Sequence, residues 1–382
     1  GCRAYLWIAL KTKEIVMKIL AINPGSTSTK IAVFEDDKEI FKKSLVHTAE
    51  ELKDFKNNND QIPYRKQMIL DALQENGLSL SDIDGFASRG GGQCSHVGGT
   101  YRVNKRMVQE AHDEIYASHP ALLGCQIAFM FEKETGKPSF MVNSPATDEM
   151  RQIARLTGIK GVYRICYSHA LNQKEAARRY AESVGKAYED LNLIVCHIGG
   201  GISVTAHEKG KMVDTNDILN GDGPMAPTRT GSIPAVDMIH LSFSGKTEKE
   251  LMKFVRSQGG LSDHLGTFDA REVVERIKNG DIYAKNVYDA MIYQIGKYAG
   301  SMYAAMNCQL DGIVFTGGMA HDTYLVDRLK KQIGAMAPVA VLPGEFEMEA
   351  LAHGAYDALL HHNAFEYTGI PVWTEKQLYE TL

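Results

Sequence analysis

Two tight turns rich in glycine and hydroxyl residues, each set between short apolar strands, constrain this chain more than any other feature. The first covers residues 23–30 (NPGSTSTK), between MKILAI and IAVFE, and the second covers residues 197–203 (HIGGGIS), after LIVC. Glycine lets a backbone approach an anion closely, and the free N–H groups of such a turn form a concave site for phosphate oxygens. Because the turns lie in separate halves of the chain, they predict a phosphate chain held from both sides of a cleft.

The strand pattern around the second turn repeats the pattern around the first. Residues 17–44 read as strand, glycine-rich turn, strand, short turn and strand, and residues 190–216 have the same layout. This likeness indicates a duplicated unit. Helices follow the strands in both halves, so we expect an α/β fold of two domains with mixed sheets flanked by helices. A length of 382 residues is one at which two domains are common.

Three segments have apolar residues at helical spacing: 63–78, with Pro63 at its start and Gly77 at its end, 284–307, and roughly 347–363. Two further segments, 85–91 and 311–320, read as strands that run into glycine pairs. One face of the second helical segment is apolar, which indicates a core face. Its members are Val287, Met291, Ile295, Tyr298 and Met302.

Composition excludes several classes of partner. The net charge of -5 offers no basic surface for nucleic acid or an anionic membrane, and no stretch approaches the roughly 20 apolar residues of a membrane span. The six cysteines are scattered without metal-binding spacing, which indicates reduced thiols in a cytoplasmic protein. Residues 1–16 are expected to be a leader or an appended extension, because Met17 stands directly before a strong strand.

A site for anions must therefore be built locally, and the loops supply candidates. Arg89 and Arg229 lie in Gly- and Pro-rich loops with no carboxylate partner nearby in sequence, and guanidinium groups fork onto carboxylates and phosphates. His197 stands at the rim of the second turn, and Gly317–Gly318 occupy a strand-to-helix junction that suits a nucleotide. The structural alternatives are an ordinary Asn-Pro-Gly turn, solvated arginines and a common Gly-Gly connector.

Nine stretches together resemble the superfamily of acetate and sugar kinases, heat-shock chaperones and actin, and within it the short-chain fatty acid kinases, the butyrate kinases above all. They are INPGSTSTKIAVF, SRGG, SHPALLG, TDEM, SHALNQKEAAR, HIGGGISV, GDGPMAPTRTGSIP, IVFTGGMAH and LPGEFEMEALAHGA. The resemblance implies two duplicated ribonuclease H-like (actin-like ATPase) domains with a cleft between them. Residues 17–150 with 349–382 would form the N-terminal domain, and residues 151–348 the C-terminal domain.

The same resemblance implies a carboxylate kinase that transfers the γ-phosphoryl group of ATP to butanoate, reversibly, giving butanoyl phosphate and ADP. The residues implied to bind the nucleotide are Asn23, Ser26, Thr27, Ser28, Thr29, Lys30, Gly199, Gly200, Gly201, Gly317 and Gly318. Those implied to act on the carboxylate and the phosphoryl group are Arg89, His119, Asp148, His169, His197 and Arg229. Mg²⁺ would be held by Asn23 and Glu347 with help from Asp148, Glu345 being the competing choice. A homodimer or larger homo-oligomer is also implied.

Alternatives remain open at this level. The chain has Ala121-Leu122 where the butyrate kinases usually have Ser-Asn, and VNSPATDEM replaces a more apolar stretch, so acetate, propionate or a branched-chain acid is an alternative substrate. A sugar kinase on the same fold would need an aspartate base for its alcohol, and Asp148 is the one candidate. A non-catalytic ATP-binding module is a third alternative, but the sequence shows no DNA-binding appendage and no peptide-binding domain.

Overall fold

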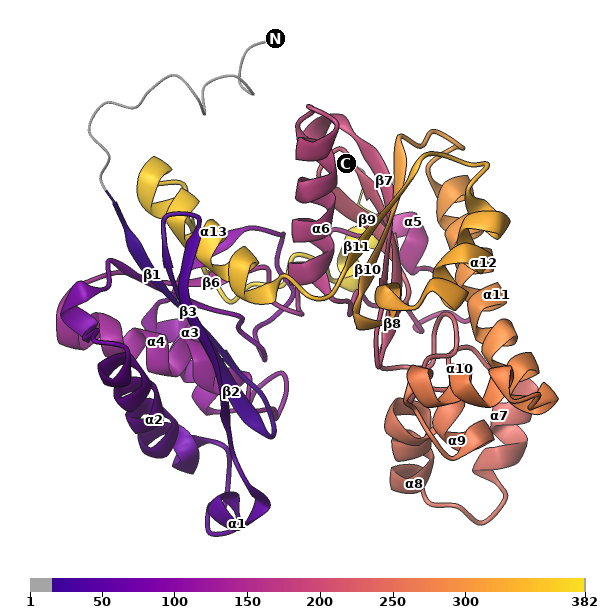
Figure 1. Ribbon diagram of the computed structural model, residues 1–382, viewed down its shortest axis with the longest axis horizontal. Helices are drawn as coiled ribbons and strands as arrows, with labels where there is room; N and C mark the ends of the chain where they lie inside the picture. The colour runs from indigo at the N-terminus through magenta and orange to yellow at the C-terminus, as the bar shows by residue number, and fades with distance from the viewer. Residues whose placement is uncertain (1–15, 381–382) are drawn as a thin grey trace. The chain divides into compact units, whose positions relative to one another are not determined.

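The computed structural model describes residues 16–380 (Figure 1). Contacts divide the described residues into two compact units, one made of residues 16–148 and 346–380, the other of Glu149–Glu345. Apart from Val16, the expected N-terminal extension lies outside the described residues. Within residues 16–380, no helix combines the length and the apolar character needed to cross a membrane.

The first unit contains a seven-stranded mixed sheet in the order β12-β5-β6-β4-β1-β2-β3. β1 pairs antiparallel with β2 and parallel with β4, which in turn is parallel to β6. The first glycine turn therefore lies at the end of β1, an interior strand of the sheet. The strands are β1 (Lys18–Pro24), β2 (Ser28–Glu35), β3 (Lys38–Val46), β4 (Gly85–Ser88), β5 (Thr100–Arg102), β6 (Ser139–Val142) and β12 (Phe365–Glu366).

Helices cover both faces of this sheet. Leu20 of β1 belongs to one apolar cluster with Leu123 of α4. Ile19 points to the opposite face, where it and Leu359 of α13 both lie against Gly85. Figure 1 shows α13, in yellow, against the indigo strands, so the end of the chain completes the unit that its beginning starts. The helices are α1 (Ala49–Leu52), η1 (Asn59–Gln61), α2 (Ile62–Glu75), η2 (Leu80–Asp82), α3 (Lys105–His112), α4 (Leu122–Thr135), α13 (Glu347–His361) and η6 (Glu375–Tyr379).

The second unit contains a five-stranded mixed sheet in the order β11-β10-β7-β8-β9. β7 is antiparallel to β8 and parallel to β10, and β10 is parallel to β11. The order and directions match β6-β4-β1-β2-β3 of the first unit, so the duplicated α/β fold with mixed sheets is confirmed. The strands are β7 (Asn192–Ile198), β8 (Ile202–Glu208), β9 (Lys211–Thr215), β10 (Gly312–Gly317) and β11 (Val339–Pro343).

The two faces of the second sheet are covered by α11 and α6. Ile194 of β7 packs with Met291 of α11 in one cluster, and Val195 packs with Ala177 of α6 in another, because neighbouring strand residues face opposite sides. The helices are α5 (Gln152–Arg155), α6 (Ala170–Ser183), η3 (Tyr188–Asp190), α7 (Ala235–Ser242), α8 (Glu248–Lys253), η4 (Phe254–Gln258, a π-helix), α9 (Leu261–Leu265), α10 (Ala270–Lys278), α11 (Ile282–Ala305), η5 (Gly318–His321) and α12 (Thr323–Ile333).

The helices expected from periodicity are present with small changes at their ends. α2 has Pro63 in its first turn, and Gly77 follows it with a φ of 71°. The apolar face expected for α11 belongs to the core of the second unit. α13 ends at His361, because His362 adopts a left-handed conformation with a φ of 52°, which stops the helix before Asn363.

Candidate active site

A buried arginine that sequence reasoning missed holds the first glycine turn. Arg65 of α2 is fully buried, and its Nη1 donates to the backbone oxygen of Gly25 and to Oγ1 of Thr29, both at 2.9 Å. Its Nε and Nη2 donate to Oε1 of Gln61 at 3.0 and 2.8 Å. Among the described residues no carboxylate pairs with this guanidinium, and burial lowers the pKa of Arg65 to about 10. Its positive charge therefore favours an anion at the turn.

The sequence does contain a signal for Arg65. Ile62, Arg65 and Ile69 follow one another at spacings of three and four residues, so the arginine occupies a position on the apolar face of α2. A cation at such a position must find acceptors inside the protein, since an isolated buried charge is costly. Sequence alone does not identify those acceptors.

The residues of the first turn differ in exposure. Ser26, Thr27 and Lys30 are exposed, whereas Asn23 and Thr29 are buried. The hydroxyl of Thr29 is already engaged, because it lies 2.8 Å from Nε2 of His47 as well as 2.9 Å from Arg65. Ser26 and Thr27 therefore lie open to solvent, while Thr29 anchors the turn from inside.

The two residues implied for Mg²⁺ meet in the first unit. Nδ2 of Asn23 donates to Oε2 of Glu347 at 2.7 Å, where Glu347 is the first residue of α13. Oε1 of Glu345 lies 3.7 Å from Nε2 of His197 in the second unit. No group of three His, Cys, Asp or Glu side chains suited to a metal occurs between residues 16 and 380. One carboxylate with an amide nonetheless fits Mg²⁺, which keeps several waters and takes its other ligands from phosphates.

His119 lies in the same unit as Arg89 and feels its charge. Arg89 directly follows β4 and is half-buried. Nδ1 of His119 accepts a hydrogen bond of 3.1 Å from the N–H of Ala121. Burial lowers the pKa of His119, and the guanidinium groups of Arg89 and Arg65 lower it further. The imidazole is therefore neutral at pH 7, with its proton on Nε2 as a hydrogen-bond donor.

The glycines after Arg89 pack closely on the segment that departs from the butyrate-kinase pattern. A Cβ at Gly91 would lie 2.9 Å from Cβ of Ala121, and a Cβ at Gly92 would lie 2.1 Å from Cδ2 of Leu122. The loop that carries Arg89 is thus fitted to a small residue at position 121.

Asp148 lies in the segment between β6 and α5, which starts at Gln152. The backbone N–H of Asp148 donates to the oxygen of His96 at 2.8 Å, and the residue is only 6% exposed. A carboxylate buried to this extent needs hydrogen-bond donors or a cation beside it.

In the second unit, His169 and His197 form a stacked pair. Their ring centroids are 3.8 Å apart and their planes differ by 9°. His197 lies in β7 and is 2% exposed, whereas His169 directly precedes α6. Asn172 contacts Nδ1 of His197 at 2.9 Å, and Ser203 contacts Nδ1 of His169 at 2.9 Å. Two histidines far apart in the sequence thus form one aromatic surface beside the second glycine turn.

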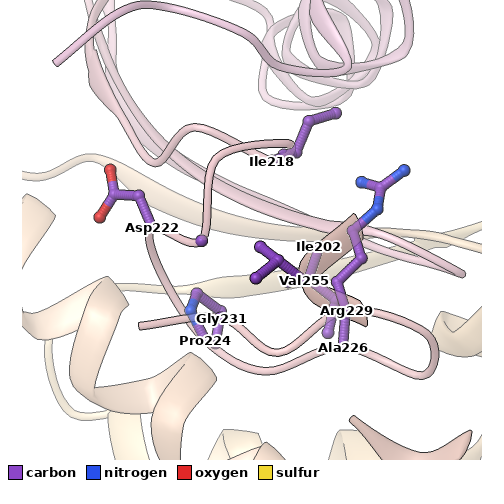
Figure 2. Close-up of a pocket in the computed structure, with 9 residues that line it drawn as sticks. Ile202, Ile218, Asp222, Pro224, Ala226, Arg229, Gly231 and Val255 are labelled. Atoms are coloured by element: carbon purple, nitrogen blue, oxygen red, sulfur yellow. The ribbon is translucent and has the colours of Figure 1, made fainter. Parts of the chain in front are cut away.

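Arg229 is the strongest candidate for an anion-binding group in the second unit. Its Nε and Nη1 are buried and have no hydrogen-bond partner among the described residues, and burial lowers its pKa. Figure 2 shows its guanidinium turned away from Pro224, Ala226 and Gly231 of the same loop. A Cβ at Gly201 would lie 2.0 Å from Nη1 of Arg229. Unpaired buried donors cost free energy, so we expect a ligand to supply the missing acceptors.

The Gly-Gly junction after β10 combines a packing role with an open position. Gly317 has a φ of 89°, and a Cβ there would lie 2.4 Å from the oxygen of Ile198, so this glycine is required by the backbone of β7. Gly318 is exposed, and no atom of the described part of the chain lies within 4 Å of the position that a Cβ would take. The junction continues as the 3-10 turn η5 before α12 begins at Thr323.

Comparison with known proteins gives relatives along nearly the whole chain. The sequence model of the acetokinase family matches residues 157–378. A probable butyrate kinase of Phocaeicola vulgatus is 45% identical over 90% of this chain and 97% of its own length. A probable butyrate kinase of Clostridium botulinum is 44% identical, and butyrate kinase 2 of Clostridium acetobutylicum is 42% identical. Both alignments cover 90% of this chain, and 97% and 96% of those proteins.

Solved structures show the same fold at much lower identity. The acetate kinase of Porphyromonas gingivalis superimposes with a TM-score of 0.75 at 21% identity, over 90% of this chain and 100% of that one. The propionate kinase of Francisella tularensis superimposes with a TM-score of 0.72 at 19% identity, over 88% of this chain and 98% of that one.

Proposed function

This chain belongs to the acetokinase family, and on that premise we propose that it transfers the γ-phosphoryl group of ATP to butanoate, reversibly, giving butanoyl phosphate and ADP. Relatives named butyrate kinase, 42–45% identical over 90% of the chain, support this substrate. The structural observation that carries the proposal is Arg229, which lies beside the Gly199–Gly201 turn and has two buried nitrogens without an acceptor among residues 16–380. An anionic ligand is what completes such a site.

The chemistry requires charge compensation rather than proton abstraction. A carboxylate has a pKa near 4–5 and is already ionised at neutral pH, so no general base is needed. The barrier comes from bringing an anionic nucleophile to an anionic phosphate. Cations and neutral N–H donors lower that barrier by stabilising charge in the transition state. Each unit offers groups of these kinds, and the relatives named butyrate kinase favour a carboxylate over a sugar as the acceptor.

We assign the following roles as part of the proposal. In the first unit, Arg89 and His119 bind the carboxylate, and Asp148 and the Ser26–Thr27 hydroxyls serve the phosphates and their metal. Thr29, which is buried, acts through the shape of the turn. In the second unit, His197 and His169 donate to the phosphoryl oxygens and Arg229 binds the transferring group. The N–H groups at Gly199–Gly201 and Gly317–Gly318 receive the nucleotide, and Lys30 supplies a further exposed charge.

Mg²⁺ belongs to the same proposal, with Asn23 and Glu347 as the protein residues that would hold it. When bound, Mg²⁺ neutralises charge on phosphate oxygens and orders them for displacement. The hydrogen bond between Asn23 and Glu347 fixes the orientation of both side chains. They meet where β1 ends and α13 begins. A homo-oligomeric assembly and a cytoplasmic location remain predictions of this proposal.

The test is formation of acyl phosphate, trapped by hydroxylamine as the hydroxamate, from ATP and a panel of straight and branched acids of two to five carbons. We expect the highest kcat/KM with butanoate. Preference for acetate, propionate or a branched acid would replace the substrate and keep the reaction class. Absence of product with every acid would contradict the proposal. The variant R229Q should lose activity, whereas R271Q, which alters an arginine with a 92% exposed side chain, should not.

A further inference from the structure

The stacked histidines are held by two neighbouring amide side chains of α6. Asn172 and Gln173 are both fully buried. Nδ2 of Asn172 lies 2.9 Å from Nδ1 of His197. Nε2 of Gln173 lies 2.8 Å from Oγ of Ser203, which in turn lies 2.9 Å from Nδ1 of His169. Each imidazole therefore meets a chain of hydrogen bonds through its Nδ1 atom.

A backbone carbonyl determines which atoms donate and which accept in the hydrogen bonds that lead to His197. The hydroxyl of Thr316 donates its proton to the oxygen of Gly344 at 3.2 Å, and a carbonyl can only accept. Oγ1 of Thr316 must then accept from Nδ2 of Asn172, 3.2 Å away. This orients the NH₂ group of Asn172 toward His197 as well. Nδ1 of His197 accepts from it, so the ring proton lies on Nε2.

Two backbone carbonyls determine in the same way which atoms donate in the hydrogen bonds that lead to His169. Nε2 of Gln173 faces the oxygens of Val195 and Ser203 at 3.3 and 3.1 Å, so this end of the side chain carries the NH₂ group. The same group donates to Oγ of Ser203. Ser203 is fully buried, and among the described residues Nδ1 of His169 is the acceptor within reach of its hydroxyl proton. That nitrogen therefore accepts, and the His169 proton lies on Nε2.

The hydrogen bond made by the carbonyl oxygen of the Gln173 side chain is consistent with this orientation of the amide. Its Oε1 lies 2.9 Å from Nε2 of His207 and must accept the proton there. Nδ1 of His207 in turn accepts from the hydroxyl of Tyr188 at 2.6 Å. Burial lowers the pKa of His207 well below its usual value, so this ring is neutral. It then has one donor nitrogen for Gln173 and one acceptor nitrogen for Tyr188, as these two hydrogen bonds require.

We infer that Asn172 and Gln173 are positioning residues that fix His197 and His169 as neutral imidazoles with the proton on Nε2. The Nε2 atom of His197 is the one that lies at the second glycine turn, 3.3 Å from where a Cβ of Gly199 would stand. Both rings are then donors before any ligand arrives, without two like charges in a 3.8 Å stack. The catalytic consequence rests on the proposed phosphoryl transfer, in which a donor aimed at a phosphoryl oxygen is useful and a bare nitrogen is repelled.

The proton positions are measured by ¹H–¹⁵N correlation of the imidazole nitrogens in the full-length protein with labelled histidine. The variants H197Q and H169Q assign the two signals among the 13 histidines. We expect the Nε2–H pattern for both rings of the wild type. The variant N172D replaces a donor with an acceptor, so His197 should gain a proton on Nδ1. At about pH 9, where a free imidazole is neutral, kcat should fall about 100-fold while the KM for butanoate changes little.

A matched control is N192D, which makes the same replacement at a buried position of β7 whose side chain contacts neither histidine. Its imidazole spectrum should equal that of the wild type. Should N172D fold poorly, T316V removes only the hydroxyl that orients Asn172, and His197 should then show both tautomers.

A proton on Nδ1 of His197 in the wild type would overturn the inference, and so would an unchanged His197 spectrum in N172D and T316V. Loss of activity in N172D with an unchanged spectrum would also overturn it, because it would indicate a purely structural role. If the wild type forms no acyl phosphate yet shows both Nε2–H patterns, the proposed function fails while the assignment of the protons stands.

Discussion

The side-chain amide of Asn23 donates a hydrogen bond of 2.7 Å to the carboxylate of Glu347, which follows it by 324 residues. Asn23 lies near the end of β1, and Glu347 begins α13 on the same sheet. A carboxylate at a helix N-terminus is favoured by the helix dipole, and its hydrogen bond to Asn23 fixes its orientation. The end of the chain thus supplies a charged group to the turn built by its beginning.

If Glu347 binds Mg²⁺ in this protein, E347Q should raise the Mg²⁺ concentration at half-maximal activity about 10- to 100-fold. The neutral amide keeps the size of the side chain but weakens its attraction for the cation. E349Q is the control, because Glu349 lies in the same first turn but pairs with Lys42 at 3.6 Å. A larger Mg²⁺ shift in E345Q than in E347Q would assign the metal to Glu345 instead.

The second glycine turn allows a sharp steric test. A Cβ at Gly201 would lie 2.0 Å from Nη1 of Arg229, whereas a Cβ at Gly200 would meet no atom within 4 Å. G201A should displace the guanidinium and lower kcat/KM about 100-fold, since a misplacement of about 1 Å at a reacting centre costs this much. G200A should stay within a few-fold of the wild type. An equal loss of kcat/KM in G201A and G200A would show that displacement of Arg229 is not the cause.

Arg65 should matter for stability as well as for the turn. R65M leaves the oxygens of Gln61, Gly25 and Thr29 without their donor, which should lower the free energy of unfolding by about 3 kcal/mol. K66M is the matched control, because Lys66 forms a partly exposed ion pair with Glu134, and such a pair contributes about 1 kcal/mol or less. Denaturant titration of both variants measures the difference, and similar losses would contradict the role of Arg65.

His47 makes stability depend on pH. Burial lowers its pKa from 6.5 to about 4 in the folded protein, and Arg65 contributes to the shift. Between these values the unfolded chain binds a proton that the folded protein does not, so stability falls as the pH falls from about 6.5 to about 4. The loss from this residue is up to about 3 kcal/mol.

The variant H47Q should therefore show a shallower decline of unfolding free energy over that range of pH. H240Q, which alters an exposed histidine of α7, is expected to keep the wild-type slope. Identical slopes for wild type and H47Q would show that the His47 proton does not contribute.

The parts of the fold that depend on near neighbours could be predicted from the sequence. The two strand–turn–strand patterns predicted β1–β3 and β7–β9, because a two-residue period and a glycine turn are local properties. The core face of α11 could be predicted for the same reason. The loops with Arg89, Arg229 and Gly317–Gly318 stood out because glycine marks close backbone approach, and the packing at Gly201 and Gly317 is of this kind.

Only the tertiary structure identified the groups that hold these residues in place. Arg65 reaches Thr29 across 36 residues, Asn172 reaches Thr316 across 144, and Asn23 reaches Glu347 across 324. Each of these hydrogen bonds forms where strand order and helix packing bring distant segments within about 3 Å. No periodicity along the chain encodes that distance, because a side-chain hydrogen bond depends on directions in space. The sequence by itself determined the two glycine turns and their strands, from which it predicted anion sites, and the packing decided which side chains hold those turns.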